Sequence, residues 1–244
     1  MAAAPPPLHL FNEEADGDLP VRRAIALLLG VCSVLRLHHT VKYSALALLV
    51  DRSLPTLEAA AASGQGHESP PLAPLVLAVV LLSSKLHETQ GLLISELRAA
   101  TLKIAPEVHA RLTAKEVVDA EIWLVTKVNT GVLRPLSDTI FSLLTQLQLS
   151  QGSGAPRISF SECTLILDLL SERLACRGWL TSGGRGLAAA VITAAAVFSV
   201  PPCQRAGAAP WLAWLACGES LDDVQRAAEL IVHLCITAVS KDEA

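Results

Sequence analysis

Glu121 is the residue whose position most needs a chemical explanation. The segment from 112 to 129 opens with a capping box, Thr113 and Glu116, so helical register can be counted from a defined start. Counted in this way, Glu121 falls in the middle of an apolar stripe. The other members of the stripe are Val117, Val118, Leu124, Val125 and Val128. A carboxylate buried there without a partner would cost on the order of several kcal/mol. We therefore expect Glu121 either to pair within the chain or to face a second protein.

Patterns of known catalytic and metal sites are missing from the sequence. There is no Gly-x-Ser-x-Gly, P-loop, dinucleotide fingerprint or His-Glu-x-x-His. His38 and His39 lie at a junction between two expected helices and lack the third ligand of a zinc site, which favours solvated or capping roles. The run from Ser182 to Gly186 lacks the Gly-Lys-Ser/Thr ending of a phosphate loop and indicates a helix-entry turn. We predict no catalytic residue, no cofactor and no metal.

The cysteines are widely scattered and form no Cys-x-x-Cys pair. Most of them fall within apolar helical patterns, which is typical of small buried side chains in a reducing compartment. We therefore expect a protein of the nucleus or the cytoplasm. The cysteines are Cys32, Cys163, Cys176, Cys203, Cys217 and Cys235.

Composition predicts an all-α protein. Of the 244 residues, 52% are apolar and only 4% aromatic, so packing depends on Leu, Ala and Val, a composition that favours helices. A net charge of −4 gives no electrostatic footprint for nucleic acid. The longest apolar runs, 24–35 and 186–200, fall short of the ~20 residues of a membrane span. We expect neither nucleic acid nor a membrane as partner.

The chain divides into two halves of similar rhythm. Residues 1–18 read as a disordered lead, and residues 55–74, rich in Ala, Gly, Ser and Pro, read as a flexible loop inserted into the first half. Helix 75–86 is apolar on all sides and is expected to be a central helix. In the second half, the Ala-rich helix 186–199 takes the corresponding place. The remaining helices are expected at 20–37, 41–54, 94–104, 113–129, 135–149, 159–176, 209–217 and 220–239.

Three short motifs, in the correct order, resemble the cyclin box. The run Leu-Leu-Ser-Ser-Lys-Leu-His-Glu at 81–88 is similar to the family's Leu-Leu-Ala-Ser-Lys-Phe-Glu-Glu. The run Arg-Ala-Ile at 23–25 matches its Met-Arg-Ala-Ile-Leu, and Leu-Val-Asp-Arg at 49–52 matches its Tyr-Ile-Asp-Arg. The resemblance implies two tandem five-helix domains, at 19–132 and 133–240. It also implies a structural salt bridge between Arg23 and Asp51.

The same resemblance implies a binding site for a protein kinase. In cyclins, a lysine and a glutamate at the positions of Lys85 and Glu121 form a polar pair on the surface that receives the regulatory helix of the kinase. Leu86, Val125 and Val132 would supply apolar contacts beside that pair. The implied partner is a cyclin-dependent Ser/Thr kinase, which the chain would bind and activate.

Some positions depart from the family pattern. Thr130 stands where cyclins commonly have Phe, and Arg22 and Leu29 stand where cell-cycle cyclins use a Met and a Trp to dock substrates. The chain also resembles, more weakly, the divergent cyclin N-terminal domain-containing proteins linked to meiotic crossovers. Two hypotheses follow: a kinase-activating cyclin, or a cyclin-fold scaffold for another partner, as in transcription factor IIB or retinoblastoma-type proteins.

Overall fold

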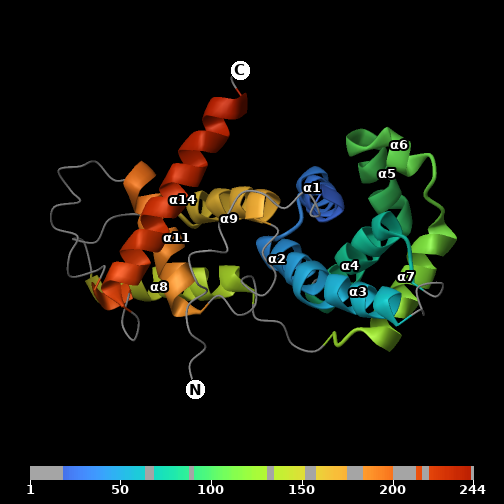
Figure 1. Ribbon diagram of the computed structural model, residues 1–244, viewed down its shortest axis with the longest axis horizontal. Helices are drawn as coiled ribbons and strands as arrows, with labels where there is room; N and C mark the ends of the chain where they lie inside the picture. The colour runs from blue at the N-terminus through green and yellow to red at the C-terminus, as the bar shows by residue number, and fades with distance from the viewer. Residues whose placement is uncertain are drawn as a thin grey trace. The chain divides into compact units, whose positions relative to one another are not determined.

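The computed structural model describes residues 19–63, 69–87, 91–130, 135–151, 158–174, 184–199, 213–215 and 220–242. In these ranges the regular secondary structure is helical and contains no strand, which confirms the all-α prediction. The helices fall into two compact units, α1 to α7 and α8 to α14 (Figure 1). The predicted lead at 1–18 and the predicted domain boundary at 132/133 lie outside the described residues.

The first unit begins with α1 and ends with α7. Its elements are α1 (Leu19–Val34), α2 (His39–Ala47), the π-helix η3 (Leu48–Ser53), α3 (Leu54–Ala62), α4 (Leu72–His87), α5 (Ile94–Ile104), α6 (Pro106–His109) and α7 (Ala114–Lys127). The bounds of α5 are those predicted, whereas the single turn α6 was not foreseen.

Helix α4 is the centre of the first unit. Every residue from Pro74 to Leu81 is buried, and so are Ser83 and Ser84. Helices α1, α2, α5 and α7 all pack against it (Figure 1). Each fully buried Leu or Val contributes about 1.5–3 kcal/mol relative to an exposed one, so α4 is the main source of stability in this unit. The prediction of a central helix is confirmed.

The predicted loop at 55–74 is wrong in its first part, because α3 follows η3 without a break and continues the helical run to Ala62. Pro55 lies in the first turn of α3. A proline ring crowds the carbonyl four residues earlier, here that of Asp51 within η3. The wider turn of a π-helix relieves such crowding, and Ser53 Oγ donates a hydrogen bond to the Leu48 carbonyl five residues back, at 2.8 Å. The proline therefore sits inside a long helical run.

Helix α7 starts at the predicted capping box. The backbone N–H of Glu116 donates to Thr113 Oγ1 at 3.2 Å, and the backbone N–H of Thr113 donates to Glu116 Oε2 at 2.8 Å. The backbone hydrogen bond from Thr113, followed by its hydroxyl, holds the pKa of Glu116 below 4.5. The start of α7, and with it the direction of every later side chain, is therefore fixed locally.

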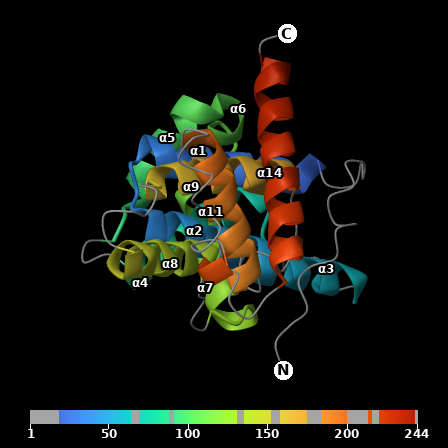
Figure 2. The ribbon, with the colours of Figure 1, turned by 90° about the vertical axis from the view of Figure 1, so that its left-hand side faces the viewer.

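The second unit is built around α11. Its helices are α8 (Leu136–Gln151), α9 (Phe160–Leu174), α11 (Arg185–Ser199) and α14 (Leu221–Asp242). Residues 188–192 and 194–196 of α11 are buried, mostly alanines, and α8, α9 and α14 pack against this helix. Small side chains permit close approach, and α11 runs beside α14 in both views (Figures 1 and 2). Only 213–215 of the short helix expected at 209–217 is described, and it is helical.

Arg185, at the start of α11, forms hydrogen bonds with the helical residues 213–215. Its Nε donates to the carbonyl of Leu215 and its Nη2 to the carbonyl of Trp214, both at 3.2 Å. The guanidinium carbon also lies 5.2 Å from the centre of the Trp214 ring, within the range of a cation–π contact. One side chain thus joins two segments about thirty residues apart.

Replacing Thr113 by Ala should lower the free energy of unfolding by about 1 kcal/mol, because α7 loses its N-cap. Glu116 would lose the hydrogen bond from the Thr113 hydroxyl, the second of the two bonds that lower its pKa, and would keep the bond from the backbone N–H. A group with a lowered folded pKa stabilises the fold above its unfolded pKa, and this contribution disappears as pH falls through the folded value. In urea unfolding, the difference between wild type and Thr113→Ala should therefore shrink from neutral pH to below 4.5. Thr113→Ser should keep the cap; a loss equal to that of Ala would contradict the assignment.

Replacing Arg185 by Ala should destabilise the second unit by about 2 kcal/mol, since two charge-assisted hydrogen bonds disappear. Arg185→Lys should restore little, because one ammonium cannot reproduce the forked geometry of a guanidinium. Urea unfolding followed by tryptophan fluorescence measures both effects. Full recovery with Lys would mean that the paired carbonyl contacts are not what stabilises this segment.

Candidate functional site

Lys85 and Glu121 meet across the contact between α4 and α7. Lys85 Nζ lies 2.5 Å from Glu121 Oε1. Lys85 belongs to the last turn of α4, where a positive charge is favoured by the helix dipole, and Glu121 lies midway along α7. The two helices pack closely beside each other, so residues 36 positions apart in sequence form one polar pair. The structure thus brings together the pair that the sequence singled out.

The pair lies at the surface. The side chain of Lys85 is 48% exposed and that of Glu121 is 18% exposed. Water screens such a pair, and exposed ion pairs contribute roughly 0–1 kcal/mol to stability. Stability alone therefore gives little reason for this pairing, while its exposure leaves both charges within reach of another molecule.

The apolar stripe predicted around Glu121 is split by the fold. Val117, Leu124 and Val128 are buried, but Val118 and Val125 are exposed. The buried face of α7 also includes Ala120 and Trp123, which shifts its centre away from Val118 at about 100° of rotation per residue. Glu121 consequently lies at the edge of the buried face, and this position explains how its carboxylate reaches solvent and Lys85.

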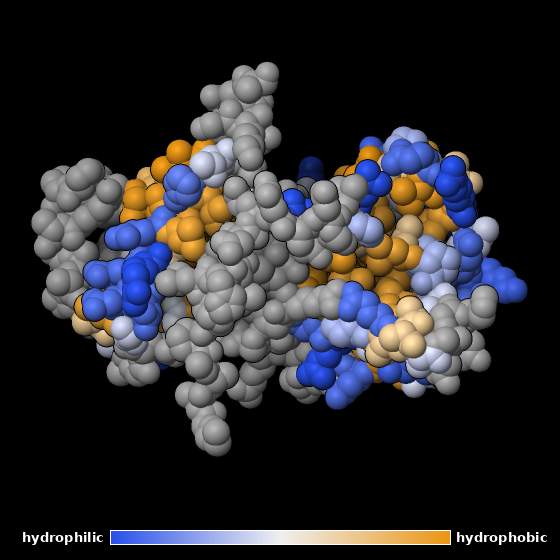
Figure 3. All heavy atoms as spheres, viewed as in Figure 1, coloured by the Kyte–Doolittle hydropathy of each residue, from blue (hydrophilic) through white to orange (hydrophobic). Residues whose placement is uncertain are grey.

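Exposed apolar side chains flank the polar pair. Leu86, next to Lys85, is 60% exposed, and Val125, one turn after Glu121, is 58% exposed. Ile122 is 57% exposed and was not predicted as part of the site. Its signal in the sequence was its spacing: with Val118 and Val125 it forms an i, i+4, i+7 row on one side of α7. Apolar side chains of the first unit also appear in the surface view, bordered by hydrophilic ones (Figure 3).

Other predicted positions have different outcomes. Val132 lies outside the described residues, and Thr130 is half-buried. Arg23 is exposed and Asp51 is half-buried. Their salt bridge stays a prediction. Leu29 and Arg22, both on α1, stand at the two positions where cell-cycle cyclins dock substrates. Leu29 is buried and Arg22 is exposed.

The histidine pair and the described cysteines have structural positions. His38 is the N-cap of α2 and its Nδ1 accepts the backbone N–H of Thr40 at 3.4 Å, which agrees with a capping role. Cys32, Cys163 and Cys235 are buried, and burial raises the pKa of Cys163 to about 12. Across the described ranges, no group of His, Cys, Asp and Glu could hold a metal ion, and none of the helices is long and apolar enough to cross a membrane.

Comparison with known proteins identifies two plant relatives. Cyclin-J18-like from Oryza sativa subsp. japonica is 28% identical over 237 residues, covering 91% of this chain and 88% of that protein. Cyclin-J18 from Arabidopsis thaliana is 27% identical over 224 residues, covering 87% of this chain and 94% of that protein. No family model matches the chain. Similarity along nearly the whole of both proteins, together with an all-α fold, agrees with the three motifs. The chain is therefore similar, over nearly its whole length, to two proteins named as cyclins.

Proposed function

We propose that this protein is a regulatory subunit that binds a cyclin-dependent Ser/Thr kinase and favours its active state. The observation that carries the proposal is the ion pair between Lys85 and Glu121, exposed and flanked by apolar side chains. Both plant relatives are named as cyclins, which supports a regulatory role. Binding rather than catalysis also agrees with the lack of catalytic motifs in the sequence.

The surface is suited to binding because it is held rigid before any partner arrives. The end of α4 is fixed by a fully buried helix body, and α7 is fixed by its capping box and by its packing against α4. Little free energy is then needed on binding to order the backbone that carries these side chains. A mobile helix of the kinase that fits the surface only in its active position would be shifted toward that position.

The polar pair and its apolar neighbours would have different tasks. Lys85 can donate hydrogen bonds to the partner, and Glu121 can accept them, while each continues to neutralise the other when water is removed. Leu86, Val125 and Ile122 would lose their contact with water on binding and so supply affinity. Val132 is proposed as a further apolar contact from the family resemblance.

A cyclin-fold scaffold is the second candidate. Leu29 is buried and Arg22 exposed at the two positions where cell-cycle cyclins dock substrates, and Thr130 replaces the common Phe. These differences favour a protein that holds its partner without recruiting substrates by that surface. A scaffold of this kind has no requirement for Lys85 and Glu121, so the two candidates make opposite predictions for variants of the pair.

The double variant Lys85→Ala/Glu121→Ala should lose a cyclin-dependent kinase that the wild type captures from cell extract. We expect a decrease of at least about tenfold, since truncation of a charged group that is hydrogen-bonded within an interface costs about 2–5 kcal/mol, and tenfold corresponds to about 1.4 kcal/mol. Captured kinases are identified by mass spectrometry, and circular dichroism checks that the variant remains folded.

Asp223→Ala is the matched control, because it breaks the exposed ion pair between Asp223 and Arg226 on α14. The control should capture the kinase as the wild type does. Capture of no kinase, or equal capture by the folded double variant, would favour the scaffold. Addition of the wild-type protein to the purified kinase should then raise phosphorylation of a generic substrate; unchanged activity would contradict activation.

Ile122→Ser and Val125→Ser should each weaken binding of the captured kinase by about tenfold, because burial of either apolar side chain would be lost. Leu149→Ser on α8 is the control, since Leu149 is likewise an exposed apolar residue. Titration by isothermal calorimetry measures the three variants. Equal affinity for all three would show that the exposed side of α7 does not contact the kinase.

A further inference from the structure

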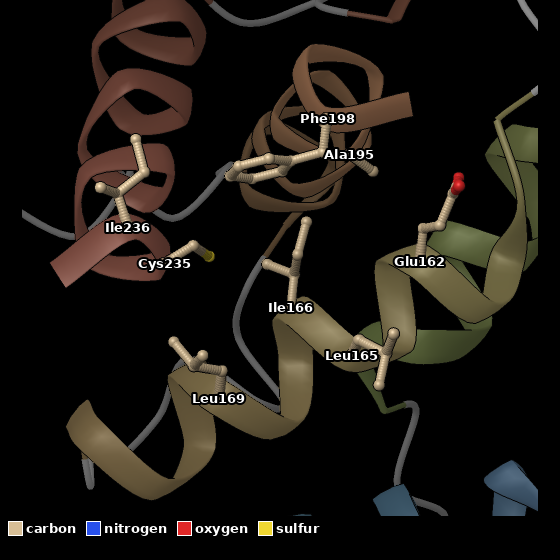
Figure 4. A pocket seen from close by; sticks show the side chains of 8 residues that line it. All are labelled: Glu162, Leu165, Ile166, Leu169, Ala195, Phe198, Cys235 and Ile236. Atoms are coloured by element: carbon tan, nitrogen blue, oxygen red, sulfur yellow. The ribbon is translucent and has the colours of Figure 1, made fainter. Parts of the chain in front are cut away.

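The second unit carries an apolar groove of about 440 Å³ between α9, α11 and α14. This α9–α11–α14 groove belongs to one unit and has no part in the Lys85–Glu121 surface of the other. Figure 4 shows side chains from all three helices turned toward it. Its lining consists of Glu162, Leu165, Ile166, Leu169, Ala195, Phe198, Cys235 and Ile236.

The groove exposes large apolar side chains that a folded chain normally covers. Leu165 is 68% exposed, and Phe198 and Ile236 are each about half exposed, although they come from three different helices. Apolar residues gathered in this way on a protein surface mark a site of interaction. Scattered single residues would not line a common cavity, as these do.

Glu162 makes the two ends of the groove differ in charge. It is the only charged residue in the lining, and it lies at the opposite end of the row from Cys235 and Ile236 (Figure 4). Its Oε2 accepts the backbone N–H of Ser159 at 3.0 Å, which holds the carboxylate in place at the start of α9. A ligand that fills the groove therefore meets an ordered negative charge at one end and only apolar side chains at the other.

The charges around the groove favour a cationic partner. The described acidic side chains of this unit are Asp138, Glu162, Asp168, Asp222, Asp223 and Glu229. Its described basic side chains are both engaged, Arg185 with two carbonyls and Arg226 with Asp223. The excess of acidic over basic groups among these described side chains favours a positively charged partner and disfavours a second acidic surface. In a two-fold dimer the two grooves would face each other, so a second copy of this chain is a poor occupant.

We propose that the α9–α11–α14 groove binds a basic amphipathic helix of a partner protein. Glu162 and Leu169 are seven residues apart, two helical turns, so the groove matches a helix with apolar anchors at i, i+3 or i+4, and i+7. A Lys or Arg of that helix pairs with Glu162, while its apolar side chains cover Leu165, Phe198 and Ile236. The kinase proposal does not depend on this contact, because the groove lies in the other unit.

The test uses the full chain and a synthetic helix as the probe. The peptide has about 15 residues, enough for marginal helicity, with leucines at i, i+3, i+4 and i+7 and lysines beside them. A matched peptide carries glutamates in place of the lysines. Fluorescence anisotropy measures binding of each labelled peptide to wild type, Leu165→Gln, Glu162→Gln and the control Leu149→Gln. The side-chain carbonyl of Gln can also accept the backbone N–H of Ser159, so Glu162→Gln keeps the start of α9.

We expect the lysine peptide to bind the wild type at least about tenfold more tightly than the glutamate peptide. Leu165→Gln should weaken it by about tenfold, Glu162→Gln should remove much of the charge preference, and Leu149→Gln should change nothing. No binding, equal binding of both peptides, or equal losses in all variants would overturn the proposal. So would light scattering that finds a dimer dissolved by Leu165→Gln, since the groove would then hold a second copy.

Discussion

The burial of α4 on all sides is the constraint on which the first unit depends. A helix without a solvent face must be covered by others, and α1, α2, α5 and α7 cover it. Its polar residues are therefore confined to its end, where Lys85 emerges. The position of Glu121 follows from the same packing, since α7 can bury only one side against α4 and leaves the carboxylate at the border. The candidate site is thus the place where the apolar core reaches the surface.

The central helices of the two units, α4 and α11, pack against their neighbours with different side chains. The core of α4 is made mainly of Leu and Val, whereas that of α11 is mainly Ala. Larger side chains fill the space between helices, and smaller ones let neighbouring helices come closer. In the second unit α9, α11 and α14 still leave a groove lined by Leu165 and Phe198, so its apolar surface is incompletely covered. One central helix thus ends in a polar pair, and the other lies beside an open apolar groove.

Local signals in the sequence predicted much of this fold. The capping box at Thr113 and Glu116 located α7, and the all-apolar run 75–82 identified α4 as central, because both features act within a few residues. The prediction of a loop from Pro55 onward was wrong. A proline inside a helix usually ends it, but here the π-helix η3 before Pro55 allows the helical run to continue. The pairing of Lys85 with Glu121 was predicted from the family resemblance, and the sequence alone does not specify it.

Periodicity also could not decide which apolar residues face water. Val118 and Val125 share spacing with the buried stripe of α7, but the actual buried face is centred nearer Ala120 and Trp123. That centre is set by how α4 meets α7, a tertiary contact outside the reach of a helical pattern. For the same reason Ile122, adjacent to Glu121 and exposed, was missed as a candidate contact.

A double-mutant cycle on Lys85 and Glu121 tests most directly whether the pair exists for binding. The cycle is measured twice, once for urea unfolding of the protein alone and once for affinity to the captured kinase. We expect a coupling energy below about 1 kcal/mol for unfolding, as for other exposed pairs, and a larger one for binding. A coupling of several kcal/mol in unfolding with none in binding would contradict this expectation, and would make the pair a structural element.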